Sequence, residues 1–392
     1  MKVLICNAGS TSLKFKLYEM PRATVLAQCH IERVGSADDA TLRYGNKVSG
    51  ASVDLRGQNI PDYRVGIERF LACLTQGDTA VVADISEIER VGYKSVLSKD
   101  HYGIHEIDEG VMQGMRDFLA LAPVHNSAYL KAIETVQAAL PAARHVGCFE
   151  TAFHQTIPLE RKLYGVPYEW YETYGIQRLG YHGASHSYIA DVLSREAGPH
   201  YRAISCHLGG SGSICAIQDG KSVDTSFGMS LETGLIHANR VGDMDPTMVL
   251  FLKRQGLSDD EIKRGLEKQG GLLGISGVSN DLRYVLDAAH EGNERAELAV
   301  GVFVTGIVHY IGAFYLDLGS LDQLVFTAGI GEHSAEIRRR VCERLAPIGC
   351  VLDEEKNRAD APVISAEGSK VTVRVIPTDE ELGIAKRCFA LE

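Results

Sequence analysis

Two segments of the chain, 200 residues apart, share one pattern and constrain the fold more than any other feature. Each is predicted to form a buried strand, a turn rich in glycine and serine, and a second strand. The first is Val3–Leu17 and the second is Ala203–Ile217. Glycines let backbone N–H groups converge on an anion without obstruction by side chains. Two such hairpins, each opening one half of the chain, predict a duplicated fold with a nucleotide between its halves.

Strands alternate with helices after each hairpin, which indicates an α/β architecture. Apolar periodicity predicts helices over 63–76, 107–139, 183–197, 246–268, 280–290 and 293–318. Short apolar runs predict strands over 144–149, 323–327 and 371–376.

The length of 392 residues is too great for one ordinary core and predicts two domains. We expect the boundary near residue 150, after the strand that ends at Phe149. The N-terminal domain would then comprise residues 1–150 and the C-terminal domain residues 151–378. An amphipathic helix over 379–392 is expected to pack back on the first domain.

The net charge of −11 argues against nucleic acid as a partner, because no basic stripe is available to meet a phosphate backbone. Nine cysteines without a C-x-x-C motif predict free thiols in a reducing cytosol. No signal peptide is expected before the strand-like Val3–Cys6. No membrane span is expected either, because no apolar stretch approaches about 20 residues. These features predict a cytoplasmic protein.

The turns of the two hairpins are the first candidate ligand sites. Asn7–Lys14 contains an amide, three hydroxyl residues and a lysine, which can bind and neutralise phosphate oxygens. An ordinary polar hairpin remains an alternative for this segment. His207–Gly212 has three glycines in six residues, and its similarity to the first turn favours phosphate binding over a simple tight turn. A P-loop is excluded, since the sequence has no G-x-x-x-x-G-K-[ST] motif.

Three further segments carry residues of chemical interest. Gly329–His333 is predicted to be a turn between a strand and the helical run 334–344, a suitable bed for adenosine or phosphate. His182 and His186 are four residues apart, but no third ligand is evident and a metal site is not expected. Arg240 lies in a turn beside acids, where a solvated salt bridge is the alternative to a functional role.

The segment Pro377–Glu381 is typical of a helix start. Thr378 and Glu381 have the spacing of a capping box. That arrangement would occupy Glu381 and leave Glu380 to bind a cation.

Taken together, these segments resemble the acetate kinase family over nearly the whole chain. The resemblance is carried by Asn7–Phe15, Leu121–Asn126, Phe149–Pro158, Tyr164–His186, His207–Ser226, Val325–Glu336 and Pro377–Ala385. It places the chain in the sugar kinase, Hsp70 and actin superfamily. It implies two duplicated ribonuclease-H-like (actin-like ATPase) domains with an interdomain cleft, ATP with Mg²⁺ in that cleft, Mn²⁺ as a possible substitute, and a homodimer.

The resemblance also implies roles for individual residues. Asn7 and Glu380 would hold the metal. His182 and Arg240 would stabilise the transferring phosphoryl group, with His125 and Glu150 as further catalytic residues. The implied nucleotide-binding residues are Ser10, Ser12, Lys14, His207, Leu208, Gly209, Gly210, Ser211, Asp281, Leu282, Arg283, Gly329, Ile330, Gly331, Glu332 and His333.

The substrate side departs from the family pattern at two positions. Lys94 stands where the family usually has the arginine that binds the substrate carboxylate, and lysine cannot make the same planar two-pronged contact. Glu150 stands in place of the usual aspartate and reaches one methylene further. If the two side chains face each other, the shorter cation and the longer anion could compensate.

The residues implied to line the acyl pocket also differ from the usual set. They are Val96, Val124, Tyr181 and Leu231. Val124 is smaller and Tyr181 more polar than the usual residues. Since one methylene changes binding by only about 1–3 kcal/mol, propionate or another small acid stays open beside acetate. At the nucleotide side, His333 replaces the usual asparagine.

The sequence therefore predicts reversible, ATP-dependent phosphorylation of a short-chain carboxylate, acetate first, to an acyl phosphate by direct in-line transfer. A carboxylate is already ionised at pH 7, so it needs shielding from the phosphate charge rather than a strong base. A catalytically weak nucleotide-binding relative is the second hypothesis. A sugar kinase is disfavoured, because a hydroxyl nucleophile would require a carboxylate base.

Overall fold

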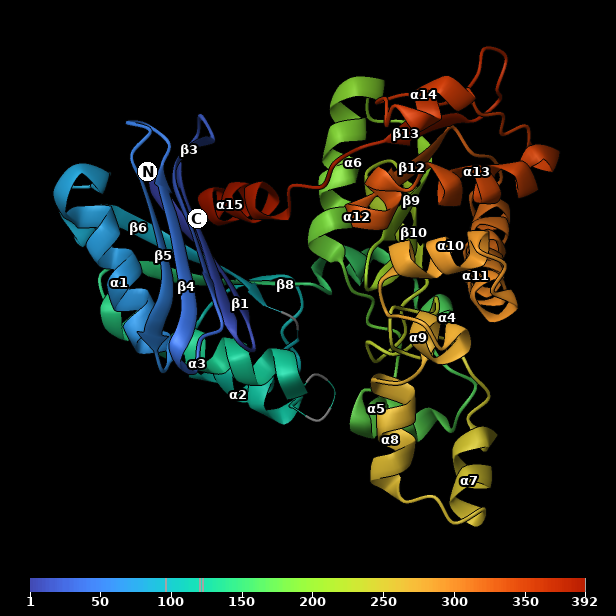
Figure 1. Cartoon of the computed structure of the whole chain (residues 1–392), viewed down its shortest axis with the longest axis horizontal. Helices are drawn as coiled ribbons and strands as arrows, with labels where there is room; N and C mark the ends of the chain where they lie inside the picture. The colour runs from blue at the N-terminus through green and yellow to red at the C-terminus, as the bar shows by residue number, and fades with distance from the viewer. Residues whose placement is uncertain (96, 120, 122, 392) are drawn as a thin grey trace. The chain divides into compact units, whose positions relative to one another are not determined.

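The computed structural model describes residues 1–95, 97–119, 121 and 123–391, with only the backbone for 123–125. The chain separates into two compact units (Figure 1). Unit 1 comprises Met1–Ala152 and Asp379–Glu392, and unit 2 comprises Phe153–Thr378. Each unit is built on one mixed β-sheet with helices against it.

The sheet of unit 1 has eight strands in the order β5-β4-β3-β2-β1-β6-β8-β7. The strands are β1 (Lys2–Gly9), β2 (Ser12–Glu19), β3 (Thr24–Glu32), β4 (Ser36–Asn46), β5 (Ser52–Ile60), β6 (Ile88–Ser95), β7 (Ile104–Glu106) and β8 (Arg144–Phe149). β1 to β5 form an antiparallel meander, while β6 runs parallel to both β1 and β8. Val3–Cys6 of β1 is buried at every position, as expected for a strand with both faces covered.

The helices of unit 1 are α1 (Tyr63–Thr75), α2 (Glu109–Asp117), α3 (Pro123–Ala139) and α15 (Glu380–Ala390). The prediction of one helix over 107–139 is wrong, since the chain forms α2 and α3 there as separate helices. α15 packs on β1, β6 and β8 (Figure 1). Gly92 permits this approach, because a Cβ there would lie 2.5 Å from the Cys388 sulfur of α15.

The sheet of unit 2 has the order β11-β10-β9-β12-β13. Its strands are β9 (Arg202–Leu208), β10 (Gly212–Gln218), β11 (Lys221–Thr225), β12 (Gln323–Thr327) and β13 (Thr372–Val375). β9, β10 and β11 are antiparallel, and β12 is parallel to both β9 and β13. β3-β2-β1-β6-β8 of unit 1 has the same order and the same strand directions. The duplication predicted from the two hairpins is therefore confirmed.

The helices of unit 2 are α4 (Leu159–Lys162), α5 (Tyr168–Tyr174), α6 (Gly183–Ala197), α7 (Thr247–Arg254), α8 (Asp259–Glu267), α9 (Gly271–Ser276), α10 (Leu282–His290), α11 (Glu294–Leu318), α12 (Ala328–His333), α13 (Ala335–Arg344) and α14 (Glu354–Arg358). The single helix predicted over 246–268 is wrong. Gly256 has a φ of +96° between α7 and α8, and Ser258 starts α8 with a capping box. Gly329–His333, predicted to be a turn, lies within the short helix α12.

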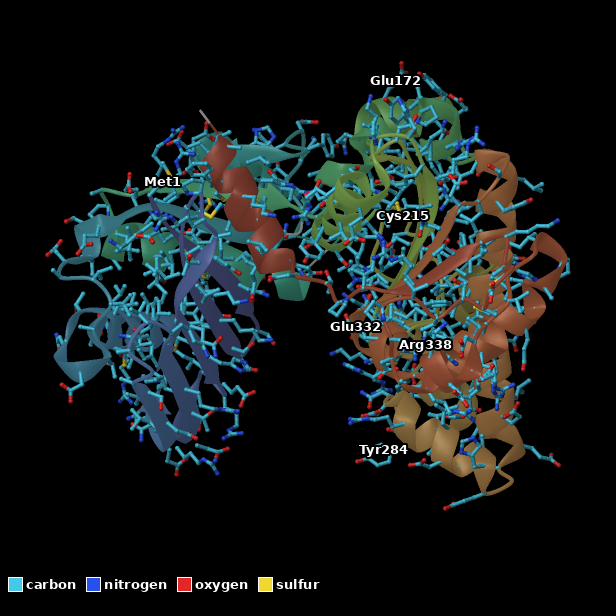
Figure 2. The ribbon with its side chains drawn as sticks, turned by 90° about the horizontal axis from the view of Figure 1, so that it is seen from above. Met1, Glu172, Cys215, Tyr284, Glu332 and Arg338 are labelled. Atoms are coloured by element: carbon cyan, nitrogen blue, oxygen red, sulfur yellow. The ribbon has the colours of Figure 1, made fainter. Side chains whose placement is uncertain are left out.

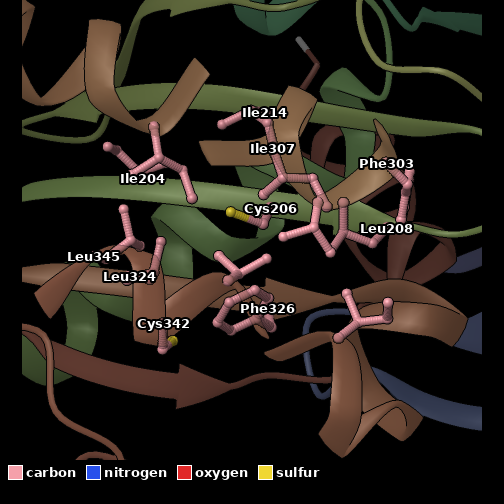
Figure 3. Close-up of a cluster of buried hydrophobic side chains, with 14 of the residues drawn as sticks. Ile204, Cys206, Leu208, Ile214, Phe303, Ile307, Leu324, Phe326, Cys342 and Leu345 are labelled. Carbon is pink, nitrogen blue, oxygen red and sulfur yellow. The ribbon is translucent and has the colours of Figure 1, made fainter. Parts of the chain in front are cut away.

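One buried hydrophobic cluster of unit 2 lies between its sheet and α11, and a second lies between the sheet and α6. Phe303 and Ile307 of α11 join Ile204, Cys206 and Phe326 from the strands in one buried cluster (Figure 3). By length and composition α11 could also cross a membrane, so the expectation that no apolar stretch approaches this length is wrong. In this fold α11 contacts β9 and β10 as a core helix.

The start of α15 differs from the predicted capping box. Asp379, not Thr378, caps the helix by accepting a hydrogen bond from the Leu382 N–H. Glu381 instead pairs with Lys16 across 3.0 Å. Glu380 is thus the first residue of the helix.

Candidate functional site

A cavity of about 720 Å³ in unit 2 unites segments that are far apart in the sequence. The predicted nucleotide residues that line it are Gly209, Gly210, Asp281, Leu282, Arg283, Gly329, Ile330 and His333. It also contains Ala238, Asn280, Leu286, Asp287, His290, Ser334 and Glu336, which the sequence reasoning missed. Helical spacing could have revealed part of this set, because Leu286, Asp287 and His290 lie one turn or two beyond Leu282 and Arg283.

Strand register explains why these segments meet. Thr327 at the end of β12 pairs with His207 near the end of the parallel strand β9, so the turns after both strands lie at one edge of the sheet. A Cβ added at Gly329 would have no atom within 4 Å, and one at Gly210 would only reach Ala238 at 3.9 Å. The glycines therefore leave room for a ligand, and the volume is typical of a small-molecule site.

Leu208, Gly331 and Glu332, also predicted to contact nucleotide, lie outside this lining. Leu208 is fully buried in the core of unit 2 (Figure 3). The fully buried Arg338 donates to the carbonyls of Gly331 and Glu332 at 2.9 and 2.7 Å. Arg338 and Glu332 are labelled in Figure 2. The Glu332 carboxylate accepts from the Thr378 N–H at 3.2 Å. In this structure Gly331 and Glu332 therefore connect α12 to Arg338 of α13, and Glu332 also connects it to Thr378.

A histidine cluster lies at the start of α6. The His182 ring stacks on the His207 ring with centroids 4.0 Å apart. His182 Nδ1 and His186 Nε2 both contact the Ser213 hydroxyl, at 2.9 and 2.8 Å. His186 Nδ1 contacts the Ser205 hydroxyl at 3.0 Å, so both of its ring nitrogens bind serines. The cluster is thus a hydrogen-bonded support for His182.

The neighbouring His207 contacts Ser185 through Nδ1 at 2.8 Å. Ser211, another predicted nucleotide residue, lies in the turn between β9 and β10, where its carbonyl accepts from the Gly209 N–H at 3.2 Å. Burial, followed by the nearby His154 and His207, holds the pKa of His186 well below its ordinary value. His186 is therefore neutral at pH 7.

The loop that carries Arg240 is fastened to the second hairpin. The Ala238 N–H donates to the Gly210 carbonyl at 2.9 Å. His237 Nδ1 accepts from the Gly212 N–H at 3.1 Å, while Nε2 donates to the Thr233 carbonyl at 3.1 Å. No sequence pattern pointed to His237. Burial lowers the pKa of Arg240 and Glu232 opposes the shift, but a guanidinium remains charged at pH 7.

Three charged side chains meet in unit 1. Lys94 Nζ on β6 lies 2.5 Å from the Glu380 carboxylate and 3.4 Å from the Glu150 carboxylate. Lys94 and Glu150 therefore do face each other. Burial disfavours the charged form of Lys94, but Glu150 and then Glu380 outweigh it and raise the pKa of Lys94 above its usual value.

Asn7 on β1 is the second predicted metal ligand of unit 1. Its side-chain oxygen accepts from the Tyr129 hydroxyl of α3 at 2.9 Å. Lys14 on β2 lies opposite Asn7 in the strand register, and Ser12 lies opposite Gly9. Sequence reasoning missed Tyr129, which no motif marks.

The remaining predicted residues are distributed as follows. Ser10 lines a second cavity, about 780 Å³ in volume, in unit 1. Tyr181 is buried, with its hydroxyl donating to the Met229 carbonyl, and Leu231 is half-buried in a turn. Val96 lies outside the described residues, and Val124 and His125 lie in α3 with side chains outside the description.

Buried histidines predict that acid destabilises unit 2. His154 Nε2 donates to the carbonyl of Tyr181, the residue that precedes His182, at 2.9 Å. Burial lowers the pKa of His154 to about 4. In the unfolded chain the His154 ring becomes protonated below about pH 6.5, whereas in the native chain it becomes protonated only near pH 4. Stability is therefore constant above about pH 7 and falls between pH 6.5 and 4, by about 3 kcal/mol for this residue.

Urea unfolding at pH 7.5 and 4.5 measures this effect. Wild type is expected to lose more stability between the two values than His154→Asn does. His200→Asn, at a side chain that is 87% exposed, is the control and should match wild type. Equal losses in wild type and His154→Asn would contradict the assignment.

Comparison with known proteins adds independent findings. A model of the Acetokinase family matches residues 2–386. Acetate kinase from Treponema denticola is 40% identical over 398 residues, which cover 100% of both chains. The crystal structure of Porphyromonas gingivalis acetate kinase is 38% identical with a TM-score of 0.88, covering 99% of this chain and 98% of that one. A propionate kinase from Francisella tularensis is 31% identical with a TM-score of 0.91, covering 100% of both.

Proposed function

Because this chain belongs to the acetokinase family, we propose that it transfers the γ-phosphoryl group of ATP to a short-chain carboxylate, acetate first, to form an acyl phosphate. The fold agrees, since the duplicated α/β units match solved acetate kinases over almost their full length. The observation that carries the proposal is the cavity in unit 2, where three predicted nucleotide segments form one lining.

The same cavity supports ATP as the phosphoryl donor. Its volume of about 720 Å³ suits an adenosine. Leu282, Leu286 and Ile330 offer apolar contacts for a base, and Asp281 and Asp287 offer acceptors for hydroxyl groups.

Phosphoryl transfer in this proposal depends on positioning and on charge. Arg240 supplies a fixed cation on a loop held by the second hairpin, and it would stabilise charge on the equatorial phosphoryl oxygens. Ser213 engages Nδ1 of His182, so His182 would donate to a phosphoryl oxygen through Nε2. The acid attacks as a carboxylate, and no residue has to remove a proton.

Mg²⁺, or Mn²⁺ in its place, would be held by Glu380 and Asn7. A carboxylate and an amide oxygen are donors of the kind that Mg²⁺ prefers, so the residues present fit this ion. When bound, it would neutralise charge on the β- and γ-phosphate oxygens.

Two wider properties belong to the same proposal. The outer face of α11 exposes Leu298 and Leu316, by 58% and 78%, and we assign it to a homodimer contact. All nine cysteines are free thiols, which supports a reducing cytosol as the compartment.

Hydroxamate trapping tests the function directly. The full chain is incubated with ATP, Mg²⁺, hydroxylamine and acetate, propionate or butyrate in turn. The acyl kinase gives an acyl hydroxamate, with acetate as the preferred acid by kcat/KM. Preference for propionate would correct the substrate within the same reaction. ATP binding without product from any acid would favour the nucleotide-binding relative instead.

A further inference from the structure

Lys94 forms an ion pair with Glu380, the carboxylate to which the proposed function assigns a divalent cation. Its ammonium lies 2.5 Å from the Glu380 carboxylate and 3.4 Å from the Glu150 carboxylate. The side chains of Lys94 and Glu380 are largely buried, with 22% and 17% of their surface exposed. An ammonium ion and a divalent cation are both attracted to the same carboxylate oxygens. Lys94 contacts the Oε2 atom of Glu380, and a divalent cation bound to that oxygen would lie within a few ångströms of the ammonium and repel it strongly.

A lysine is suited to moving away from such a contact. Its charge is a compact point at the end of a flexible four-carbon stem, and its three donors make no planar fork that must be satisfied at once. Glu150, just after β8, would keep hold of Lys94 when Glu380 is taken by another cation. The backbone need not move, since Lys94 lies within β6 and is held there by pairing with β8.

We propose that Lys94 is a resident counter-ion of Glu380 that gives way when a divalent cation binds there, and that its released ammonium then receives the substrate carboxylate. This inference rests on the proposed function for the identity of the cation and the acid. It concerns a separate property, namely that cation and acid binding are coupled through one side chain.

The coupling has two measurable consequences. The divalent cation must displace Lys94, so wild type binds it less tightly than a variant without the ammonium. The released ammonium attracts the acid, so each ligand tightens the binding of the other by the same factor, as linkage requires. A variant that lacks Lys94 loses this mutual effect.

The chain supplies a matched control at the same helix start. Lys16 on β2 lies 3.0 Å from Glu381 and 3.9 Å from Asp379, the residues on either side of Glu380. Lys16→Met removes one positive charge from the neighbourhood of α15 without touching Glu380. It therefore separates general charge effects from displacement at Glu380.

Mn²⁺ binding to the full chain tests the proposal without turnover. Free Mn²⁺ is followed by electron paramagnetic resonance at a fixed ADP concentration, with and without acetate, against a protein-free Mn²⁺–ADP blank. Lys94→Met is expected to bind Mn²⁺ about tenfold more tightly than wild type, and Lys16→Met to remain close to wild type. In wild type, acetate should tighten Mn²⁺ binding several-fold, and in Lys94→Met it should not.

Unchanged Mn²⁺ affinity in Lys94→Met, or equal gains in Lys94→Met and Lys16→Met, would overturn the proposal. If Lys94→Met does not fold, Lys94→Gln keeps a donor without the charge, and the acetate effect in wild type needs no variant. Absence of that effect in wild type also overturns the proposal. Failure of the proposed function gives a different result, namely no acyl hydroxamate from any acid.

Discussion

Arg240→Ala is expected to lower kcat for acyl phosphate formation by about 10³-fold, with little change in the KM for ATP. The guanidinium lies on a loop whose Ala238 N–H and His237 ring both bind the second hairpin. It would act on charge that develops during transfer, so its removal reduces transition-state stabilisation rather than ground-state binding.

Steady-state kinetics with hydroxamate trapping measures this loss. Arg195→Ala, at an exposed position on α6, is the control and should retain wild-type kcat. Arg240→Lys should recover only part of the rate, since lysine keeps the charge but not the planar fork. A rise in the KM for ATP with normal kcat would instead place Arg240 in nucleotide binding.

Gly329→Leu is expected to raise the KM for ATP by about 100-fold without lowering the melting temperature. The new side chain would enter the cavity of unit 2, where an added Cβ at Gly329 meets no atom within 4 Å. Displacing a ring-sized apolar group from such a site loses about 1.5–3 kcal/mol, and 2.8 kcal/mol corresponds to about 100-fold in affinity.

Nucleotide binding and thermal unfolding are measured on the same samples. Gly265→Leu is the matched control, because an added Cβ there also meets nothing within 4 Å but lies in α8, away from the cavity lining. It should bind ATP as wild type does. Normal ATP affinity in Gly329→Leu would show that the adenosine lies elsewhere.

Local sequence patterns predicted single elements well and their interruptions poorly. The strand pairs of both hairpins, α6, α10 and α11 match their predicted ranges within two residues, because each has a strong apolar period. The breaks between α2 and α3 and between α7 and α8 were missed. In the second case Gly256 ends the helix, and apolar periodicity on either side conceals such a break.

Glycine positions in the site were predictable from the sequence, whereas hydrogen-bonding partners were not. Glycine-rich turns identified two sides of the cavity in unit 2, since clustered glycines need a physical reason. Sequence patterns did not reveal four residues whose role is to form hydrogen bonds with residues distant in the sequence. They are Tyr129, Ser205, Ser213 and His237. No spacing rule can reveal such partners.

The sequence by itself determined the duplicated α/β plan, the membership of a kinase family and the glycine turns open to a nucleotide, because these depend on short-range patterns and on matching segments. Only the tertiary structure decided which carboxylate Lys94 meets. The register of β6 with β8 and the docking of α15 bring Lys94, Glu150 and Glu380 together. Charges 286 positions apart in the chain interact only after folding has brought them within a few ångströms, where Coulomb attraction becomes strong.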